Sequence, residues 1–320
     1  MRFRLTDDQR ALRAGVREVL DRRFGAEALR AAVGKPALDR GLWRALGEAG
    51  FFALRLPEEA GGVGLGLPEA VLAFEEAGRA LLPGPLVATH LAAGAVPGAA
   101  EGETVVAMVD GGLVEWWEEA DVVIGEEGAI GKGGAVGEEG AIGEGGSGAV
   151  AVRSVDPLTP LHRVSGAAPR AGDPVAAARA GDPVAVLLTA AEQLGTAARA
   201  GELAVEHART REQFGRPIGA FQAVQHLCAE ALVRVEVARA AVYAASVTGD
   251  AADIAGARVL ADEAAVQGAR DCLQVLGGMG FTWEADVHLS LKRAWVRARR
   301  AGGARESEEL LARELLSGAG

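Results

Sequence analysis

Two short polar turns interrupt the Ala-rich helical sequence in the second half of this 320-residue chain. The first, TREQFGRPIGAFQAVQH, spans residues 210–226. It places Arg211 and Gln213 in the last turn of a predicted helix, which Gly215 and Pro217 would end. An arginine presents a planar fork of hydrogen-bond donors that suits phosphate. We therefore expect this turn to bind a phosphate-containing group.

The second turn is QVLGGMGFTWE, at residues 274–284. Gln274 offers an amide group, and Gly277, Gly278 and Gly280 leave the backbone bare, so that a phosphate or another backbone can approach closely. A lone glycine run of this kind is more often the end of a helix than a binding site. The two turns together are more specific, because they connect helices of one predicted bundle.

Four helices that would position these turns are predicted in the Ala-rich sequence from about residue 184 to the end. They span 184–212, 220–247, 250–276 and 286–315, with Phe221 at the start of the second. Long helices with short connections favour an antiparallel four-helix bundle.

The first hundred residues are also predicted to be helical. Helices are expected at 5–24, with Thr6 as the N-cap, at 39–54 and at 67–82. Residues 80–100 carry no charged side chain, but three prolines interrupt them, so we expect a turn and a short buried helix rather than a membrane span.

Short β-branched runs separated by Gly and Asp begin near residue 103 and predict strands, at 104–112, 120–125 and 148–155. The expected fold class is therefore mainly α with a small β domain. We predict an N-terminal helical domain at 1–100, a short middle β domain at 101–168 and a C-terminal four-helix bundle at 184–320.

The net charge of −11 is concentrated in one region. Residues 101–150 hold twelve acids and one base, so the rest of the chain is neutral. Part of this region is a near-duplicate, GEEGAIG at 125–131 and again at 137–143. The acidic, Gly-rich stretch at 125–148 is either an acidic docking loop or a hairpin tip lengthened by duplication.

Composition excludes several function classes. The absence of a basic stripe argues against nucleic-acid binding. The five histidines show no metal-ligand spacing, so no metal site is expected. Cys228 and Cys272 fall in predicted helices and are interpreted as reduced thiols of a cytoplasmic protein.

The two turns and the N-terminal segment LWRALGEAGFFALRLPEEAGGVGLGLPEAVLAFEEAGRAL resemble the acyl-CoA dehydrogenase family over almost the full length of the chain. RTREQFGRPIGAFQAVQH and QVLGGMGFTWEADVHLSLKRAW are similar to its two C-terminal signatures. The resemblance implies that both turns hold the adenine and pyrophosphate side of an FAD bound mainly by the neighbouring subunit. The FAD-contacting residues it implies are Arg211, Gln213, Phe221, Gln222, Gln274, Gly277 and Gly278.

The sequence departs from the family where the catalytic base is expected. The family removes an α-proton with a glutamate, usually in a Glu-Gly-Thr segment, while a β-hydride passes to the flavin. Here Ala301 stands roughly at that position, and the alternative position on the first bundle helix falls near Ala185. Glu192, two turns away, and Glu284, beside the glycine turn, are interpreted as structural. No catalytic residue is therefore assigned.

The β domain departs as well. The family's Thr-Glu-Pro segment and Trp-containing strand, which surround the isoalloxazine ring, are missing between residues 100 and 165. Trp116 and Trp117 have acidic flanks and do not match. We expect that this chain does not enclose a flavin ring by itself.

Three hypotheses remain open. In the first, the chain is the non-catalytic subunit of an FAD-dependent acyl-CoA dehydrogenase, paired as α2β2 with a paralogue. Such a complex would act on an acyl-CoA, possibly a steroid side-chain CoA ester, and pass electrons to an electron-transfer flavoprotein. In the second, it is a self-sufficient homo-oligomeric dehydrogenase with Glu192 as a relocated base. In the third, it is a non-enzymatic scaffold derived from the family.

Overall fold

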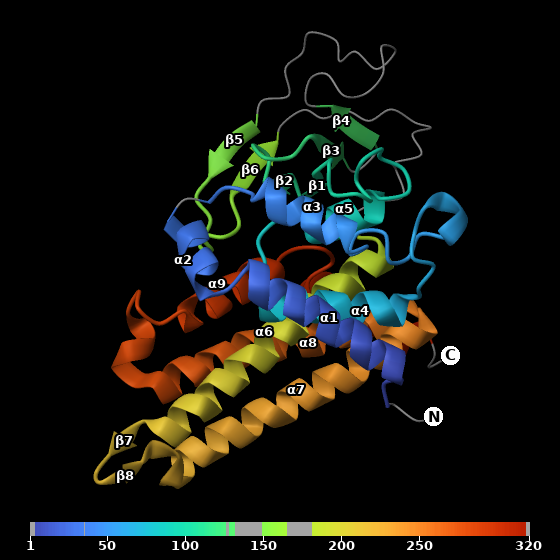
Figure 1. The fold of residues 1–320 in the computed structure, drawn as a ribbon. Coiled ribbons are helices and arrows are strands. Elements are labelled where there is room, and N and C mark those ends of the chain that lie inside the picture. Colours follow the sequence, from blue (N-terminus) through green and yellow to red (C-terminus); the bar gives the residue numbers. More distant parts are fainter. Residues whose placement is uncertain (1–3, 35, 126–127, 132–148, 165–180, 318–320) are drawn as a thin grey trace. The chain divides into compact units, whose positions relative to one another are not determined.

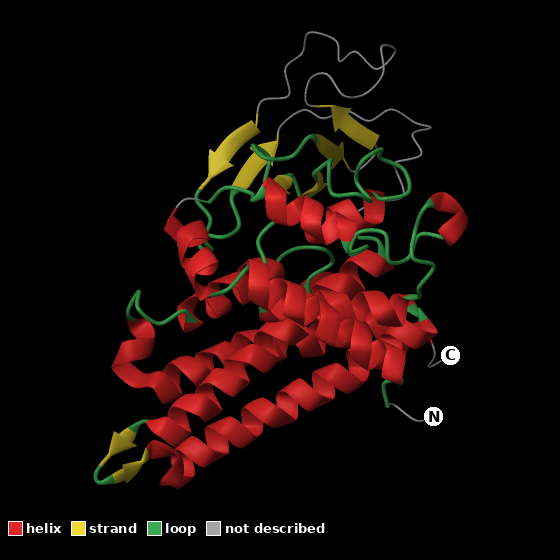
Figure 2. Ribbon diagram, in the orientation of Figure 1, coloured by secondary structure: helices red, strands yellow, loops and turns green. Residues whose placement is uncertain are grey.

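The computed structural model describes residues 4–34, 36–125, 128–131, 149–164 and 181–317, most of them helical, together with a small sheet (Figures 1 and 2). This confirms the mainly α fold class with a small β domain. Backbone contacts group the chain into two compact units. The bundle unit comprises residues 1–21, 71–82 and 186–320, and the sheet unit comprises 22–70 and 83–185. The division into three domains stays a prediction.

Three long helices of the bundle were predicted within a few residues. They are α6 (Pro183–Thr210), α7 (Gln222–Thr248) and α8 (Ala251–Leu276). Helix α8 packs against α7 and also against both helices that follow it. Its small side chains, mainly alanines, are largely buried and allow its neighbours to approach closely.

The fourth predicted helix, 286–315, is wrong as a single element. The chain forms α9 (Val287–Arg297), a bend, and α10 (Ala304–Ser317). At the bend Ala301 has a φ of 49° and Gly302 a φ of 63°, values that an α-helix cannot contain. The glycine pair Gly302–Gly303 lies at this break, and the sequence prediction extended the helix through it.

A fully buried arginine holds this bend. Arg258 on α8 donates through Nη2 to the backbone oxygens of Arg297 and Arg300, at 2.8 Å for the latter, so it caps the end of α9. Its Nε donates to Asp262 at 2.9 Å, and Asp262 also accepts from Gln193 Nε2 at 2.8 Å. The buried charge is thus paired, which a buried guanidinium requires.

The N-terminal helices α1 (Asp7–Arg23) and α4 (Leu67–Arg79) were predicted, and the expected cap is present. The Thr6 Oγ1 accepts from the backbone N–H of Gln9 at 3.1 Å, and the Gln9 side chain accepts from the Thr6 N–H at 3.0 Å. This reciprocal pair is a capping box.

In the sheet unit, the predicted helix at 39–54 is shorter than expected. Helix α3 (Arg40–Glu48) is followed by turns, because Gly50 has a φ of 77° and reverses the chain. Helix α2 (Ala26–Gly34) was not predicted. The short buried helix expected within 80–100 is confirmed as α5 (Leu86–Ala92).

In the sheet unit, six described strands form a mixed sheet in the order β4-β3-β1-β2-β6-β5. β1 and β3 pair in parallel, and the other neighbours are antiparallel. Their bounds are β1 (Val106–Asp110), β2 (Leu113–Glu115), β3 (Val122–Gly125), β4 (Gly128–Gly131), β5 (Ala149–Val152) and β6 (Leu161–Val164). Residues 126–127 and 132–148 of the acidic stretch lie outside the described residues.

Both faces of the central strands are buried. Val106 and Ile124 pack on one side with residues of the α5 segment, whereas Ala107 and Val123 pack on the other with Trp117. Successive residues of a strand point to opposite faces, so this alternation follows directly from the β conformation.

Two glycines set the crossing of α4 and α6 in the bundle unit. A Cβ atom on Gly78 would lie 2.0 Å from the Glu192 backbone oxygen, and one on Gly195 would lie 1.8 Å from that of Glu75. Any side chain at either position would separate the two helices.

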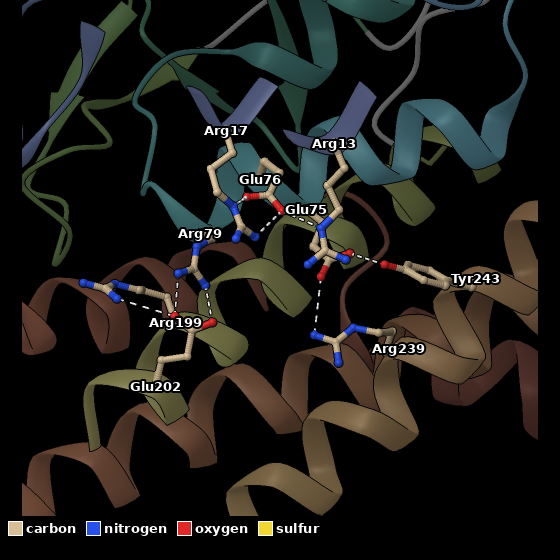
Figure 3. A network of polar contacts seen from close by, with 9 residues as sticks. All are labelled: Arg13, Arg17, Glu75, Glu76, Arg79, Arg199, Glu202, Arg239 and Tyr243. Atoms are coloured by element: carbon tan, nitrogen blue, oxygen red, sulfur yellow. Dashed lines mark hydrogen bonds and ion pairs between the residues drawn. The ribbon is translucent and has the colours of Figure 1, made fainter. Parts of the chain in front are cut away.

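A network of arginines and carboxylates surrounds this crossing and ties α1 and α4 to α6 and α7 (Figure 3). Glu76, which is buried, accepts from Arg13 Nε at 2.9 Å and from Arg17 Nε and Nη2 at 2.7 Å each. We call this network the polar layer; its residues are Arg13, Arg17, Glu75, Glu76, Arg79, Arg199, Glu202, Arg239 and Tyr243. Pairing offsets the free energy that a buried carboxylate loses when it leaves water.

Tyr243 completes the polar layer. Its hydroxyl donates to the Glu75 carboxylate at 2.6 Å, and Arg239 Nη2 lies 3.4 Å from the other carboxylate oxygen. Burial and the Glu75 charge raise the pKa of Tyr243, so the phenol stays protonated and remains a donor.

We predict that Tyr243→Phe lowers the free energy of unfolding by about 1.5–3 kcal/mol, because a hydrogen bond to a buried charge is lost. Urea denaturation followed by circular dichroism measures the change. Arg305→Ala, which breaks an exposed ion pair with Glu309, is the control and should change stability by less than about 0.5 kcal/mol. Equal stabilities of the Tyr243→Phe variant and the native chain would contradict the assignment.

His90 on α5 is a buried histidine of the sheet unit. Burial, and then the nearby Arg55 charge, lower its pKa to about 4, although hydrogen bonds with the backbone of Phe51 and Phe52 act in the opposite direction. The unfolded chain therefore binds a proton at this site at higher pH than the folded chain does.

We predict that stability falls between pH 6.5 and pH 4 partly because His90 must stay neutral in the folded state. The part of the unfolding free energy that depends on neutral His90 is fully present above pH 6.5 and is lost as the pH falls towards 4. The loss amounts to roughly 3 kcal/mol. His90→Gln should flatten the dependence of unfolding free energy on pH in this window. Parallel pH profiles for the native chain and His90→Gln would refute the prediction.

Candidate functional site

The first polar turn is a small hairpin rather than a simple helix end. Helix α6 ends at Thr210, and β7 (Glu212–Gln213) pairs with β8 (Arg216–Pro217) in antiparallel fashion. Phe214 and Gly215 connect the strands with φ values of 54° and 75°. Two consecutive positive φ values are typical of the tight turns that close two-residue hairpins.

This geometry corrects the expected positions of two residues. Arg211 is the first residue after α6 instead of part of its last turn, and Gln213 lies on β7. The backbone N–H of Arg211 donates to the His207 oxygen, and its own oxygen accepts from the Ile218 N–H, both at 2.8 Å. The arginine backbone is therefore fixed from both sides while its side chain remains exposed.

The other predicted residues of this turn lie as expected. Phe221 is the N-cap residue of α7, and Gln222 is the first residue of the helix and is exposed. The Arg216 guanidinium carbon lies 4.3 Å from the centre of the Phe221 ring. This contact presents a cation and an aromatic ring together at the end of the bundle.

The second polar turn follows α8 directly. Gly277 has a φ of 63° and a ψ of −142°, a backbone conformation that residues with a side chain disfavour. A short 3-10 helix, η4 (Gly277–Phe281), starts at this residue. A Cβ atom on Gly277 or Gly278 would meet no other atom within 4 Å, so neither glycine is needed for internal packing. Gln274 lies in the last turn of α8 and is exposed.

Both turns lie at the same end of the bundle, as Figure 1 shows for the α6–α7 and α8–α9 connections. One hydrophobic cluster joins them. Ile218 and Val224 from the first turn and Leu276 and Ala285 from the second pack against the same buried residues of α6, α8 and α9. The antiparallel arrangement therefore brings the two predicted segments together.

The polar side chains of these turns are available to a ligand. Among the described residues, neither the Arg211 guanidinium nor the Gln274 amide makes a hydrogen bond, and both side chains are exposed. The Gln213 amide donates only to the neighbouring backbone oxygen of Glu212, at 2.8 Å. A group with several phosphate oxygens could accept hydrogen bonds from these donors.

Exposed aromatic residues at this end were missed by the sequence analysis. Phe214 is 92% exposed, Phe281 75% and Trp283 69%. Lys292 lies over the Trp283 ring at 4.3 Å. Large aromatic residues inside glycine-rich turns are unusual, and that signal in the sequence could have identified them.

Two histidines report the local electrostatics. The pKa of His207 is lowered by partial burial and then by Arg211. The pKa of His288 is lowered by burial and by Lys292, with Asp286 acting in the opposite sense. Burial is the larger cause for both imidazoles, and the neighbouring cation acts in the same direction.

Comparison with known proteins agrees with this fold. Residues 6–103 match the acyl-CoA dehydrogenase N-terminal domain, and residues 185–314 match the acyl-CoA dehydrogenase C-terminal domain. The chain belongs to the acyl-CoA dehydrogenase family. The suspected resemblance is thus confirmed, and the C-terminal match includes both polar turns.

Individual acyl-CoA dehydrogenases agree over nearly the whole length. The Mycobacterium tuberculosis protein acyl-CoA dehydrogenase IpdE2 is 36% identical over 302 residues, which cover 90% of this chain and 91% of that protein. A chain in the crystal structure of the ChsE4–ChsE5 complex from the same organism has a TM-score of 0.80 at 26% identity, covering 99% of both chains. A chain of the Tcur3481–Tcur3483 steroid ACAD G363A variant has a TM-score of 0.80 at 25% identity, with 98% and 99% coverage.

The positions at which the resemblance placed an acyl-CoA dehydrogenase base are occupied by alanine. Ala185 is buried in the first turn of α6, and Ala301 is buried in the bend after α9. Gly302 at this bend lies close to Val186 of α6: an added Cβ would come within 2.7 Å of a Val186 methyl group.

Glu192 is a buried partner of an ion pair. Its carboxylate accepts from Arg297 Nη2 at 2.8 Å, and both side chains are less than a tenth exposed. Glu284 is exposed and precedes α9. The geometry of Glu192 fits the structural interpretation, because the carboxylate neutralises a buried arginine.

The remaining sequence expectations concern metals, thiols and membranes. In the described ranges, no group of three His, Cys, Asp or Glu side chains could hold a metal ion, and no helix could cross a membrane. Cys228 and Cys272 are free, with Cys272 fully buried and Cys228 half-buried. Burial raises the pKa of Cys272 to about 12, so this thiol is not a nucleophile near neutral pH.

We predict that Glu192→Gln leaves the turnover of the assembled enzyme unchanged within about threefold, while lowering its free energy of unfolding by about 3 kcal/mol. A general base would behave differently, since its loss reduces turnover by about 10²–10⁴-fold. Steady-state kinetics and urea denaturation of the same preparation separate the two effects. A loss of turnover without loss of stability would support the relocated-base hypothesis.

Proposed function

We propose that this chain is a subunit of an FAD-dependent acyl-CoA dehydrogenase in which a paralogous chain binds most of the flavin. The observation that carries the proposal is the meeting of two polar turns at one end of the bundle. There the Arg211 and Gln274 side chains are exposed and have no hydrogen-bond partner within the described residues. Donors directed outward in this way suit a ligand supplied by another chain.

The residues present fit the adenine and pyrophosphate part of FAD. Arg211 would donate to a phosphate, Gln213, Gln222 and Gln274 would supply amide groups, and Gly277 and Gly278 let the pyrophosphate approach the backbone. The Phe221 ring offers a flat apolar surface of the kind that suits adenine. When bound, FAD supplies the acceptor for a hydride from the acyl-CoA.

We further propose that the catalytic glutamate belongs to the paralogous chain. The methyl groups of Ala185 and Ala301 cannot accept a proton, and Glu192 is already paired with Arg297. This chain would then bind and orient the cofactor and leave proton removal to its partner. Its own contribution to catalysis is the positioning of the flavin.

The substrate and assembly are proposed from the relatives. Two of the similar structures are each described with two proteins, ChsE4–ChsE5 and Tcur3481–Tcur3483. The second of them is described as a steroid ACAD. By analogy we propose an α2β2 complex in the cytoplasm, acting on a steroid side-chain CoA ester and reducing an electron-transfer flavoprotein. This step rests on family likeness and not on a described substrate pocket.

We predict that the chain purified alone is colourless and that the complex co-expressed with its paralogue is yellow. In that complex Arg211→Ala should weaken FAD binding roughly ten- to a hundredfold, because a charge-assisted contact to phosphate is lost. Absorbance of the purified complex after dialysis measures flavin occupancy.

The matched control is Arg313→Ala, an exposed arginine near the end of α10. It should leave flavin occupancy unchanged. Equal occupancy in Arg211→Ala and the native complex would show that the first turn does not hold the cofactor. A yellow chain purified alone would instead favour the self-sufficient homo-oligomer.

A further inference from the structure

Three large apolar side chains are exposed in the connection between α8 and α9. Met279 and Phe281 lie in the 3-10 helix η4, and Trp283 follows two residues after it. All three side chains are exposed, and the resemblance assigned no role to any of them. Single exposed apolar side chains are common on protein surfaces, but a group of them indicates a surface that binds something.

Two side chains of α9 hold the Trp283 ring in place. Lys292 Nζ lies 4.3 Å from the ring centre, and the His288 ring is nearly perpendicular to the indole, with centroids 4.7 Å apart. His288 and Lys292 are four positions apart, so they lie on one face of α9 and cover the side of the indole that faces this helix. We call these three residues the Trp283 platform.

The rest of the indole is in water, because the Trp283 side chain is 69% exposed. A large ring that is already held by its neighbours loses little conformational entropy when a second flat group stacks on it. The Trp283 platform is therefore arranged to bind a flat group on its outer side.

Lys292 adds a positive charge beside this flat surface. Its ammonium group forms no ion pair or hydrogen bond with any residue that the structure describes, and it lies over Trp283. Burial, followed by the Lys292 charge, lowers the pKa of His288, whereas Asp286 acts in the opposite direction. A flat ring next to a cation without a carboxylate partner suits a ligand that combines a flat group with an anion.

The glycines of the second polar turn lie within a nucleotide's length of the ring. Gly277 and Gly278 begin η4, and a Cβ atom on either would meet no other atom within 4 Å. Since a 3-10 helix rises about 2 Å per residue, Gly278 and Trp283 are separated by on the order of 10 Å. Adenosine diphosphate joins a flat base to two phosphates over a comparable length. An apolar side chain of a partner protein would fit less well, because it would bury the Lys292 charge without an acceptor.

We propose that Trp283, held by His288 and Lys292, stacks on the base of an adenosine diphosphate group. The inference rests on the proposed function, and the expected source of this group is the FAD of the paralogous chain. Trp283 is then a positioning residue, which fixes the adenosine end of the cofactor and takes no part in proton removal. The CoA of the substrate contains the same chemical group with one further phosphate, so the experiment compares both sources.

The test uses the complex co-expressed with the paralogue, from which the flavin has been removed. Trp283→Ala should weaken FAD binding roughly five- to a hundredfold, because a stacked aromatic side chain contributes strongly to the affinity for a base. Binding of flavin mononucleotide, which has the flavin but no adenosine, should not change. Trp283→Phe keeps a flat ring and should restore most of the FAD affinity. Isothermal titration calorimetry measures both dissociation constants.

The matched control is Trp295→Ala on α9. Trp295 is 38% exposed, and its removal should leave both dissociation constants unchanged. Equal losses of FAD and flavin mononucleotide binding in Trp283→Ala would overturn the proposal, because they would indicate a structural role. Unchanged FAD binding together with an unchanged KM for acyl-CoA would overturn it as well. Unchanged FAD binding with a KM for acyl-CoA raised roughly tenfold would support the Trp283 platform and assign it to the CoA of the substrate.

Failure of this inference is distinguishable from failure of the proposed function. If Arg211→Ala releases flavin and Trp283→Ala changes the binding of neither FAD nor acyl-CoA, only the Trp283 platform is refuted. If flavin occupancy is unchanged in Arg211→Ala, the proposed cofactor site is refuted, whatever the result for Trp283→Ala.

Discussion

The close crossing of α4 and α6 is the constraint on which the bundle unit depends. With no side chain at Gly78 or Gly195, each helix contacts the backbone of the other. This approach brings Glu75 and Glu76 into the interior, where only the arginines and the tyrosine of the polar layer make their burial tolerable. The position of α6 fixed in this way determines where its C-terminal end, and hence Arg211, is held.

The antiparallel arrangement of the bundle helices places the two polar turns at the same end of the bundle. Connections that alternate between the two ends place the α6–α7 and α8–α9 turns together, with a shared apolar cluster beneath them. The surface there carries the Arg211 and Gln274 side chains, which have no hydrogen-bond partner among the described residues, and exposed aromatic rings. Exposed apolar rings beside exposed donors are typical of a surface that binds a ligand or another protein.

The bend after α9, where the resemblance places the family's catalytic base, is held by contacts with α8. Arg258 fixes the backbone oxygens of Arg297 and Arg300, and Ala301 adopts a positive φ that an alanine disfavours. Backbone strain of this kind persists only where the surroundings impose it. The structure thus retains the turn on which a catalytic residue is expected, although its side chain is a methyl group.

The sequence by itself determined the long helices, the capping box at Thr6 and the polar character of both turns, because these depend on local periodicity and local hydrogen bonds. It did not determine the hairpin at Phe214–Gly215, the division of α9 from α10, or the pairing of Glu192 with Arg297. The bend and the ion pair depend on residues distant in sequence, since Arg258 holds a bend some forty residues away, so only the tertiary structure decided them. The hairpin is local, but the pairing of Glu212 with Pro217 and of Gln213 with Arg216 became visible only in the structure. Packing on α8 likewise decided which face of α7 is buried.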